Sequence, residues 1–210
     1  PFLMDLKSFD LEEGVDFLRK RTEKVHDEMD ARDVVLELGG LPLALDQAAA
    51  YLKASKEKLP SYIKKLRKRK LKLLDKKSAL PPTDDVEIAR LAVQTTWGMN
   101  MDSIEEEMPM AKKLTFVLAF LSPRCIPRSI INQGSPELEN YELAEALEDD
   151  ADEMLLCLSK LSLFDRMSDD TLSVHRLVQE IIKEEINKAG LLQETLQNVQ
   201  RMLAYAIENE

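Results

Sequence analysis

The stretch LFDRMSDDTLSVH, residues 163–175, decides the fold class of this chain. Residues 163–167 and 171–174 each form a short run that suits a β-strand, and the Ser-Asp-Asp between them is typical of a turn. The stretch therefore predicts a β-hairpin. Residues 176–186, RLVQEIIKEEI, place apolar side chains at helical spacing and predict a helix directly after it.

Three short helical segments precede the hairpin. They are expected at residues 111–122, 140–147 and 151–163, and the stretch PRCIPRSII, residues 123–131, is expected to turn the chain after the first of them. Three short helices followed by a hairpin is the element order of a winged helix. A further helix is expected at residues 191–207.

The stretch LELGGLPLALDQAAAYL, residues 36–52, joins two helices of the first half. The first helix is expected to end at Leu38, because Gly39 and Gly40 enter the left-handed conformation at no steric cost. Pro42 suits the first turn of the next helix, where its missing N–H has no partner to lose. A tight helix–helix turn and a ligand that approaches the backbone closely are the two interpretations of this corner.

The stretch ALPPTDD, residues 79–85, interrupts the helical pattern, since its two prolines cannot continue a helix. We expect a helical domain at 1–80, a winged-helix domain at 81–187 and the start of a C-terminal helical region at 188–210. The predicted fold class is mainly α: a helical bundle, a winged-helix domain with one small β-hairpin, then the start of a helical array.

Charge is distributed unevenly along the chain. Residues 53–77 hold twelve Lys or Arg against Glu57 and Asp75, whereas residues 137–153 hold nine acids and no base. The net charge of −10 argues against general binding to nucleic acid. The basic block leaves open only the binding of nucleic acid at this one segment. A solvated helix face is the simpler interpretation of the block.

The sequence indicates no catalytic chemistry. It contains no Gly-x-x-x-x-Gly-Lys phosphate loop, and neither His26 nor His175 has Cys or His partners at the spacing of a metal site. A nucleophilic pair of Cys125 and His175 is conceivable. However, apolar neighbours raise the pKa of a thiol and so make it less reactive as a nucleophile. We expect Cys125 and Cys157 to be free thiols in a reducing compartment.

No apolar run approaches the roughly 20 residues of a membrane helix, and the N-terminus does not resemble a signal peptide. The sequence therefore predicts a cytoplasmic protein without a membrane contact. Because it begins on Pro1 rather than methionine, we expect a segment of a longer protein.

Several strings resemble one family of signalling proteins. GGLPLALDQAAAYL is similar to the Gly-Leu-Pro-Leu-Ala motif of the NB-ARC (STAND) ATPases, which include plant resistance proteins and the apoptosome ATPase. The strings TTWGMNMDSI, AKKLTFVLAFLSPRCIPRSII, MLLCLSKLSLFDRM and LSVHRLVQEII resemble the winged-helix part of the subset that bears tetratricopeptide repeats. The resemblance covers roughly residues 10–190.

The resemblance implies ADP or ATP as the ligand, with three contact residues here. Pro42, with its neighbour Leu41, matches the proline that lies against adenine in the family. His175 matches the histidine that contacts the β-phosphate of ADP and holds the closed state. The family's motif is Met-His-Asp, and this chain has Val174-His175-Arg176, so the aspartate is replaced by a base.

The implied function is regulatory. The chain is the helical and winged-helix part of a nucleotide-switched protein of innate immunity or cell death, and the parent is a slow ATPase. Its partners are a nucleotide-binding core expected before Pro1 and, on activation, further copies of the parent. The alternatives are a DNA-binding winged helix, which the acidic helix before the hairpin disfavours, and a helical protein-interaction scaffold that needs no nucleotide.

Overall fold

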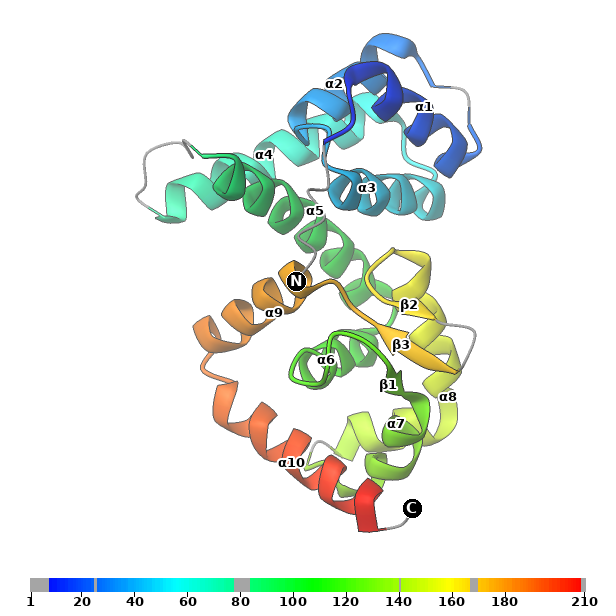
Figure 1. Cartoon of the computed structure of the whole chain (residues 1–210), viewed down its shortest axis with the longest axis vertical. Helices are drawn as coiled ribbons and strands as arrows, with labels where there is room; N and C mark the ends of the chain where they lie inside the picture. Colours follow the sequence, from blue (N-terminus) through cyan, green and yellow to red (C-terminus); the bar gives the residue numbers. More distant parts are fainter. Residues whose placement is uncertain (1–7, 25, 78–83, 140, 167–169, 209–210) are drawn as a thin grey trace, which may run out of the picture. The chain divides into compact units, whose positions relative to one another are not determined.

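The structure is a computed structural model that describes residues 8–24, 26–77, 84–139, 141–166 and 170–208. Within these ranges the chain is mainly α, with ten α-helices and a small antiparallel sheet (Figure 1), as the sequence predicts. None of the described helices is both long and apolar enough to cross a bilayer. The chain forms two compact units, Pro1–Asn100 and Met101–Glu210, each of which is described by itself.

The N-terminal unit is a helical bundle. It contains α1 (Leu11–Thr22), α2 (Glu28–Glu37), α3 (Pro42–Ser55), α4 (Leu59–Lys77) and the first part of α5 (Asp85–Glu107). The division between the units falls inside α5, after Asn100. The predicted boundary after residue 80 lies among residues 78–83, outside the described ranges.

Capping side chains determine where the first helices begin. Asp10 caps α1 and forms a capping box with Glu13. The N–H of Glu13 donates to Asp10 Oδ1 at 2.9 Å, and the N–H of Asp10 donates to Glu13 Oε2 at 3.0 Å. Helix α2 begins at Glu28, because Asp27 accepts hydrogen bonds from the N–H groups of Met29 and Asp30.

Apolar faces of α3 and α4 form much of the core of this unit. The small residues of α3 are buried, as are Tyr62, Ile63 and Leu66 of α4. Trp97 of α5 is 1% exposed and is the only tryptophan of the sequence. Its fluorescence therefore reports on the folding of the N-terminal unit.

The C-terminal unit has the element order of a winged helix. After the end of α5 come α6 (Pro109–Leu118), β1 (Ile126–Pro127), α7 (Arg128–Gly134), a 3-10 turn (Ser135–Glu137), α8 (Tyr141–Lys160), β2 (Asp165–Arg166), β3 (Thr171–Ser173), α9 (Arg176–Lys188) and α10 (Leu192–Glu208). Its buried core draws on most of these elements, with Leu114, Leu118, Leu155, Phe164 and Ile182 all at most 2% exposed.

The predicted hairpin is present. Strand β2 pairs antiparallel with β3, with Asp165 opposite Ser173 and Arg166 opposite Leu172. Two residues of the predicted turn, Ser168 and Asp169, lie outside the described ranges, and the third is Asp170. The sheet has the order β1-β3-β2, so a third strand joins the hairpin at the β3 edge.

Residues 123–131, which were expected to turn the chain, also contain a strand and the start of a helix. Ile126–Pro127 forms β1, which pairs with β3, and α7 starts at Arg128. The strand was missed because two residues show no alternation, and because Pro127 cannot donate to a ladder and is tolerated only at an edge. Ile131 of α7 is fully buried, which shows why this short helix is held in place.

The two helices predicted at 140–147 and 151–163 form one element, α8, with a kink. Asp150 has non-helical dihedrals there, φ −131° and ψ 23°. Helix α10 packs on α7 within the same compact unit as the hairpin. The N–H of Glu139 also donates to Asn198 Oδ1 of α10, at 2.7 Å.

The corner between α2 and α3 generates the first prediction. Gly39 and Gly40 have φ of +64° and +66°, and a Cβ on Gly40 would lie 2.3 Å from the carbonyl oxygen of Phe9. At Gly39 the nearest atom to such a Cβ, on Ile88, is 3.8 Å away. Gly39→Ala should therefore cost about 1 kcal/mol for the left-handed backbone alone. Gly40→Ala should cost about 3 kcal/mol, because the backbone must also shift.

Urea unfolding of both variants, followed by Trp97 fluorescence, measures these costs. Gly39→Ala is the matched control, since it has the same backbone conformation without the close approach. Equal losses in the two variants would show that the Phe9 carbonyl does not constrain the corner.

Candidate functional site

The backbone of the corner is fully used before α3 begins. The N–H groups of Gly39, Gly40 and Leu41 donate to carbonyls of α2 and its C-cap, at 3.2, 3.0 and 3.3 Å. The carbonyl of Gly40 accepts from the N–H of Phe9 at 2.8 Å. These bonds set the direction in which the chain leaves α2, and so they fix the start of α3.

Helix α3 begins on Pro42 without a side-chain cap. Its N-cap, Leu41, is extended and has no side chain that can accept a hydrogen bond from the first turn. Leu41, Pro42 and Leu43 are half-buried, whereas Ala44 and Leu45 are fully buried. The helix start therefore offers free N–H groups at the positive end of the helix dipole, next to a half-exposed apolar edge. These two features suit a flat ring: the apolar edge contacts its face, and the N–H groups contact polar atoms at its rim.

Gln47, a residue that the sequence analysis did not single out, anchors α3 to α5. Its side-chain oxygen accepts from Thr96 Oγ1 at 2.7 Å, and its backbone carbonyl accepts from Asn100 Nδ2 at 3.4 Å. Gln47 is fully buried, and its Nε2 has no hydrogen-bond partner in the described part of the chain. The only hint of this role in the sequence is one amide within an otherwise apolar run.

His175 is the N-cap of α9. Its Nδ1 accepts a hydrogen bond from the N–H of Leu177 at 3.2 Å. An accepting Nδ1 carries no proton, so the neutral ring has its proton on Nε2. The residue is exposed, and within the described ranges no hydrogen bond engages Nε2. Nε2–H is therefore available as a donor at the protein surface.

Burial and the nearby charges act on the pKa of His175 in opposite directions. Partial burial of the imidazole lowers the pKa of His175, whereas the carboxylates of Asp165 and Glu180 oppose that change. The net pKa is lowered, which keeps the ring neutral at neutral pH and keeps the cap intact. Arg176, the residue in place of the family's aspartate, is exposed.

The candidate residues belong to different compact units. Leu41 and Pro42 are part of the N-terminal unit and His175 is part of the C-terminal unit. The structure describes each of them by itself: an uncapped helix start with an apolar edge, and a surface imidazole whose Nε2 has no hydrogen-bond partner among the described residues.

Other reactive groups of the described residues show no site. Burial, followed by the charge of Glu107, raises the pKa of the Cys157 thiol, which leaves it protonated. Cys125 is exposed, and no hydrogen bond links it to His175 in the described structure. No group of three His, Cys, Asp or Glu in the same ranges could hold a metal ion.

Comparison with known proteins gives one match. Residues 102–191 match the family described as Domain of unknown function (DUF7779). The matched region runs from the end of α5 through α9 and includes the sheet, the kinked α8 and His175. It leaves the Gly-Leu-Pro corner and α10 outside. No curated protein matches the chain.

The cap of α9 predicts a pH dependence of stability. Because the pKa of His175 is lower in the folded state than its ordinary value of 6.5, the unfolded chain binds more protons as the pH falls. The stabilisation is complete above the unfolded pKa and is lost as the pH falls through the folded pKa. The free energy of unfolding should therefore decrease on acidification, before the surface carboxylates titrate.

The matched variant is His175→Asn, which keeps a capping acceptor and removes the titrating ring. Its stability should vary less between about pH 7.5 and pH 5.5 than that of the wild type in urea unfolding. His26→Gln serves as the control for the other histidine, whose pKa is also lowered by burial and then by Lys24. Identical pH profiles for wild type and His175→Asn would contradict the prediction.

Proposed function

We propose that this chain is the regulatory helical and winged-helix part of a nucleotide-switched signalling ATPase of the NB-ARC (STAND) class. In this role it contacts ADP held by the nucleotide-binding core of the same protein and controls self-association, in cytoplasmic immune or cell-death signalling. The observation that carries the proposal is the corner at Gly39–Pro42, where α3 starts without a cap beside half-exposed apolar side chains. The winged-helix order of the C-terminal unit and the position of His175 after its hairpin support it.

The residues present fit the two ends of ADP. Leu41 and Pro42 offer an apolar surface to adenine, and the free N–H groups of the first turn of α3 offer donors to its ring nitrogens. His175 offers its Nε2–H to a phosphate oxygen, and Arg176 adds a positive charge next to it. Bound ADP supplies the negative charge that makes the His175 contact favourable.

A contact of this kind works as a switch only if it exists in one state. The His175 donor stabilises the ADP-bound, closed state and has no counterpart once the winged helix moves away. Its free energy therefore biases the equilibrium between two packings rather than adding equally to both. Exchange of ADP for ATP removes this bias and frees the parent to oligomerise.

The two alternatives make different demands on the structure. A DNA-reading winged helix places basic side chains on the helix before the hairpin, whereas α8 exposes Asp152 and Glu153 there. A scaffold that needs no nucleotide has no use for an uncapped α3 start with an apolar edge. A response to ADP separates the scaffold from the proposed switch.

The proposal predicts weak nucleotide binding by the 210-residue chain on its own, because the sequence contains no phosphate loop. Titration calorimetry with ADP should show a dissociation constant no tighter than about 1 mM, with no ATP hydrolysis. The same chain joined to a nucleotide-binding core should bind ADP tightly. Tight, magnesium-dependent binding by the isolated chain would show that the phosphate site lies within it.

In the protein that includes the core, His175→Ala should speed ADP release and raise spontaneous self-association. Loss of one hydrogen bond to a charged group costs about 1–3 kcal/mol, which corresponds to about 5- to 150-fold faster release. His175→Asn distinguishes the clamp from the cap: it retains the cap of α9 but lacks Nε2. Both variants should release ADP faster. If His175→Asn behaves like the wild type while His175→Ala does not, the histidine acts only as a helix cap.

A further inference from the structure

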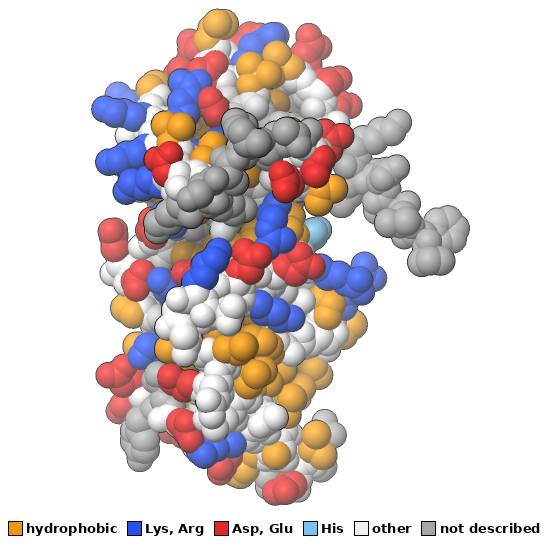
Figure 2. Space-filling view, turned by 90° about the vertical axis from the view of Figure 1, so that its left-hand side faces the viewer, with side chains coloured by type: hydrophobic (Ala, Val, Ile, Leu, Met, Phe, Trp, Pro, Cys, Tyr) orange, Lys and Arg blue, Asp and Glu red, His pale blue; other side chains and the backbone are white. Residues whose placement is uncertain are grey.

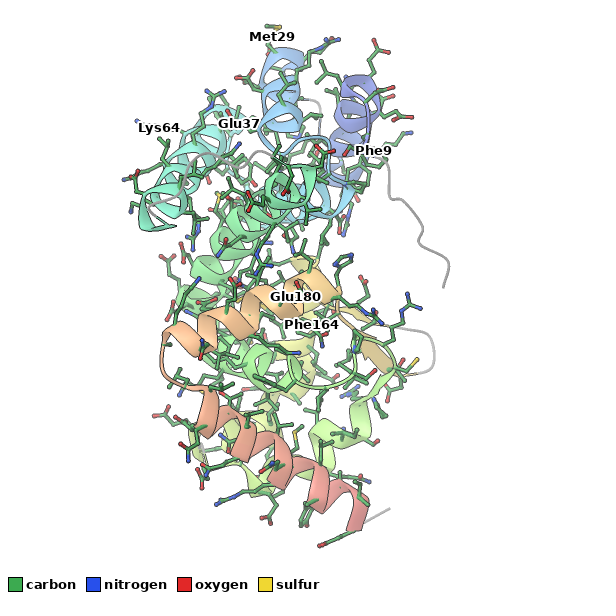
Figure 3. All side chains as sticks on the ribbon, turned by 60° about the vertical axis from the view of Figure 1, so that its left-hand side comes forward. Phe9, Met29, Glu37, Lys64, Phe164 and Glu180 are labelled. Atoms are coloured by element: carbon green, nitrogen blue, oxygen red, sulfur yellow. The ribbon has the colours of Figure 1, made fainter. Side chains whose placement is uncertain are left out.

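Part of the positive charge of the basic helix α4 is neutralised by ion pairs, one of them between Lys65 and Glu57 at 3.0 Å. On the side toward α2, Arg67 pairs with Glu37 at 2.7 Å and with Asp33 at 3.1 Å, and Lys70 pairs with Glu37 at 3.3 Å. Glu37 of α2 and Lys64 of α4 are labelled in Figure 3. These pairs attach α4 to the bundle and account for part of its positive charge. They leave the outward side of the helix to be explained.

The outward side carries a lysine stripe, which we define as Lys64, Lys68 and Lys72. The three residues are four positions apart, so their side chains line one face of the helix over about 12 Å. All three are exposed and have no ion pair within the described structure. Figure 2 shows Lys and Arg side chains gathered on the N-terminal unit, at the upper left of the view. Leu71, 61% exposed, lies beside the stripe.

Helix α8 carries the opposite surface. Glu142 and Asp152 are paired there, with Lys113 at 2.9 Å and with Arg128 at 2.6 Å. The remaining carboxylates of the helix are exposed and form no ion pair among the residues described. We call this set the acidic run: Glu145, Glu148, Asp149, Asp150 and Glu153.

We propose that the lysine stripe of one copy of this chain binds the acidic run of a second copy. Each surface is a row of unneutralised charges of one sign along a helix, so the two are complementary in charge and in length. RNA or an anionic membrane would neutralise the stripe alone and would be repelled by the acidic run and by the net charge of −10. A second copy neutralises both surfaces.

The proposed contact joins two different surfaces, so it can form in two ways. Two copies can make it twice across a two-fold axis and close a dimer, or copies can add head to tail and give rings or filaments. This inference deepens the proposed function by naming the surfaces of self-association. The test of this contact uses no nucleotide. A failure of the stripe–run contact can therefore be distinguished from a failure of the proposed nucleotide switch.

The first measurement is sedimentation velocity of the 210-residue chain from about 10 µM to about 1 mM. Exposed charges are screened beyond about 10 Å at 0.1 M salt and about 3 Å at 1 M. The weight-average sedimentation coefficient should therefore rise with concentration at about 20 mM salt and stay constant at about 1 M. A chain that remains monomeric at both salt concentrations would overturn the proposal.

Charge reversal identifies the surfaces. Lys64→Glu/Lys68→Glu/Lys72→Glu and, separately, Glu145→Lys/Glu148→Lys/Asp149→Lys should each weaken self-association at least about tenfold at low salt. An equimolar mixture of the two variants should associate again, because each supplies the complement that the other lacks. Circular dichroism verifies that both variants are folded.

The matched control is Lys20→Glu/Arg124→Glu/Lys188→Glu, which changes the net charge as much as the stripe variant does but lies outside both surfaces. It should associate within about twofold of the wild type. The contact is excluded if the control weakens association as much as the stripe variant, or if the mixture fails to associate. Binding of RNA or of phosphatidylserine vesicles that requires the stripe, in a chain that stays monomeric, would assign the stripe to that partner instead.

Discussion

The close approach of the Phe9 carbonyl to Gly40 is the constraint on which the N-terminal unit depends. A hydrogen bond joins the segment before α1 to the corner between α2 and α3, and any side chain at residue 40 would collide with it. The corner thus fixes three helices at once. It also determines that α3 starts on Pro42 with its first turn uncapped. The same geometry that closes the bundle leaves the helix start that we propose to contact adenine, so the tight turn and the ligand contact are compatible interpretations.

The parts of the fold that sequence predicted are those with a local physical signature. Asp10, Gly39 and Pro42 each act through their own backbone or through neighbours three residues away, so their roles follow from residue type. Strand β1 and the anchoring of Gln47 depend on partners 45–50 positions along the chain, and no local pattern encodes them. For the site, the sequence supplied the residues through a resemblance, and only the structure supplied the capping role of His175.

The distribution of charge has a structural logic that composition alone does not show. Arg67 and Lys70 form ion pairs with Glu37 within the helical bundle, and Arg128 forms an ion pair with Asp152 within the winged helix. Subtracting such pairs leaves single-sign rows on α4 and α8. Exposed single pairs contribute little to stability. These rows of charge are the surfaces that we propose to join two copies of the chain.

In His175 the observed capping role and the proposed phosphate contact depend on the same hydrogen bond. The Leu177 N–H occupies Nδ1, and this forces the proton of the neutral ring onto Nε2, the nitrogen that faces away from the cap. An anion near Nε2 raises the pKa of an imidazole, but protonation of Nδ1 breaks the cap of α9. The cap therefore opposes the protonation that a phosphate favours. For this reason the ring contributes a neutral donor of moderate strength, and a contact of moderate strength can be released when the nucleotide changes.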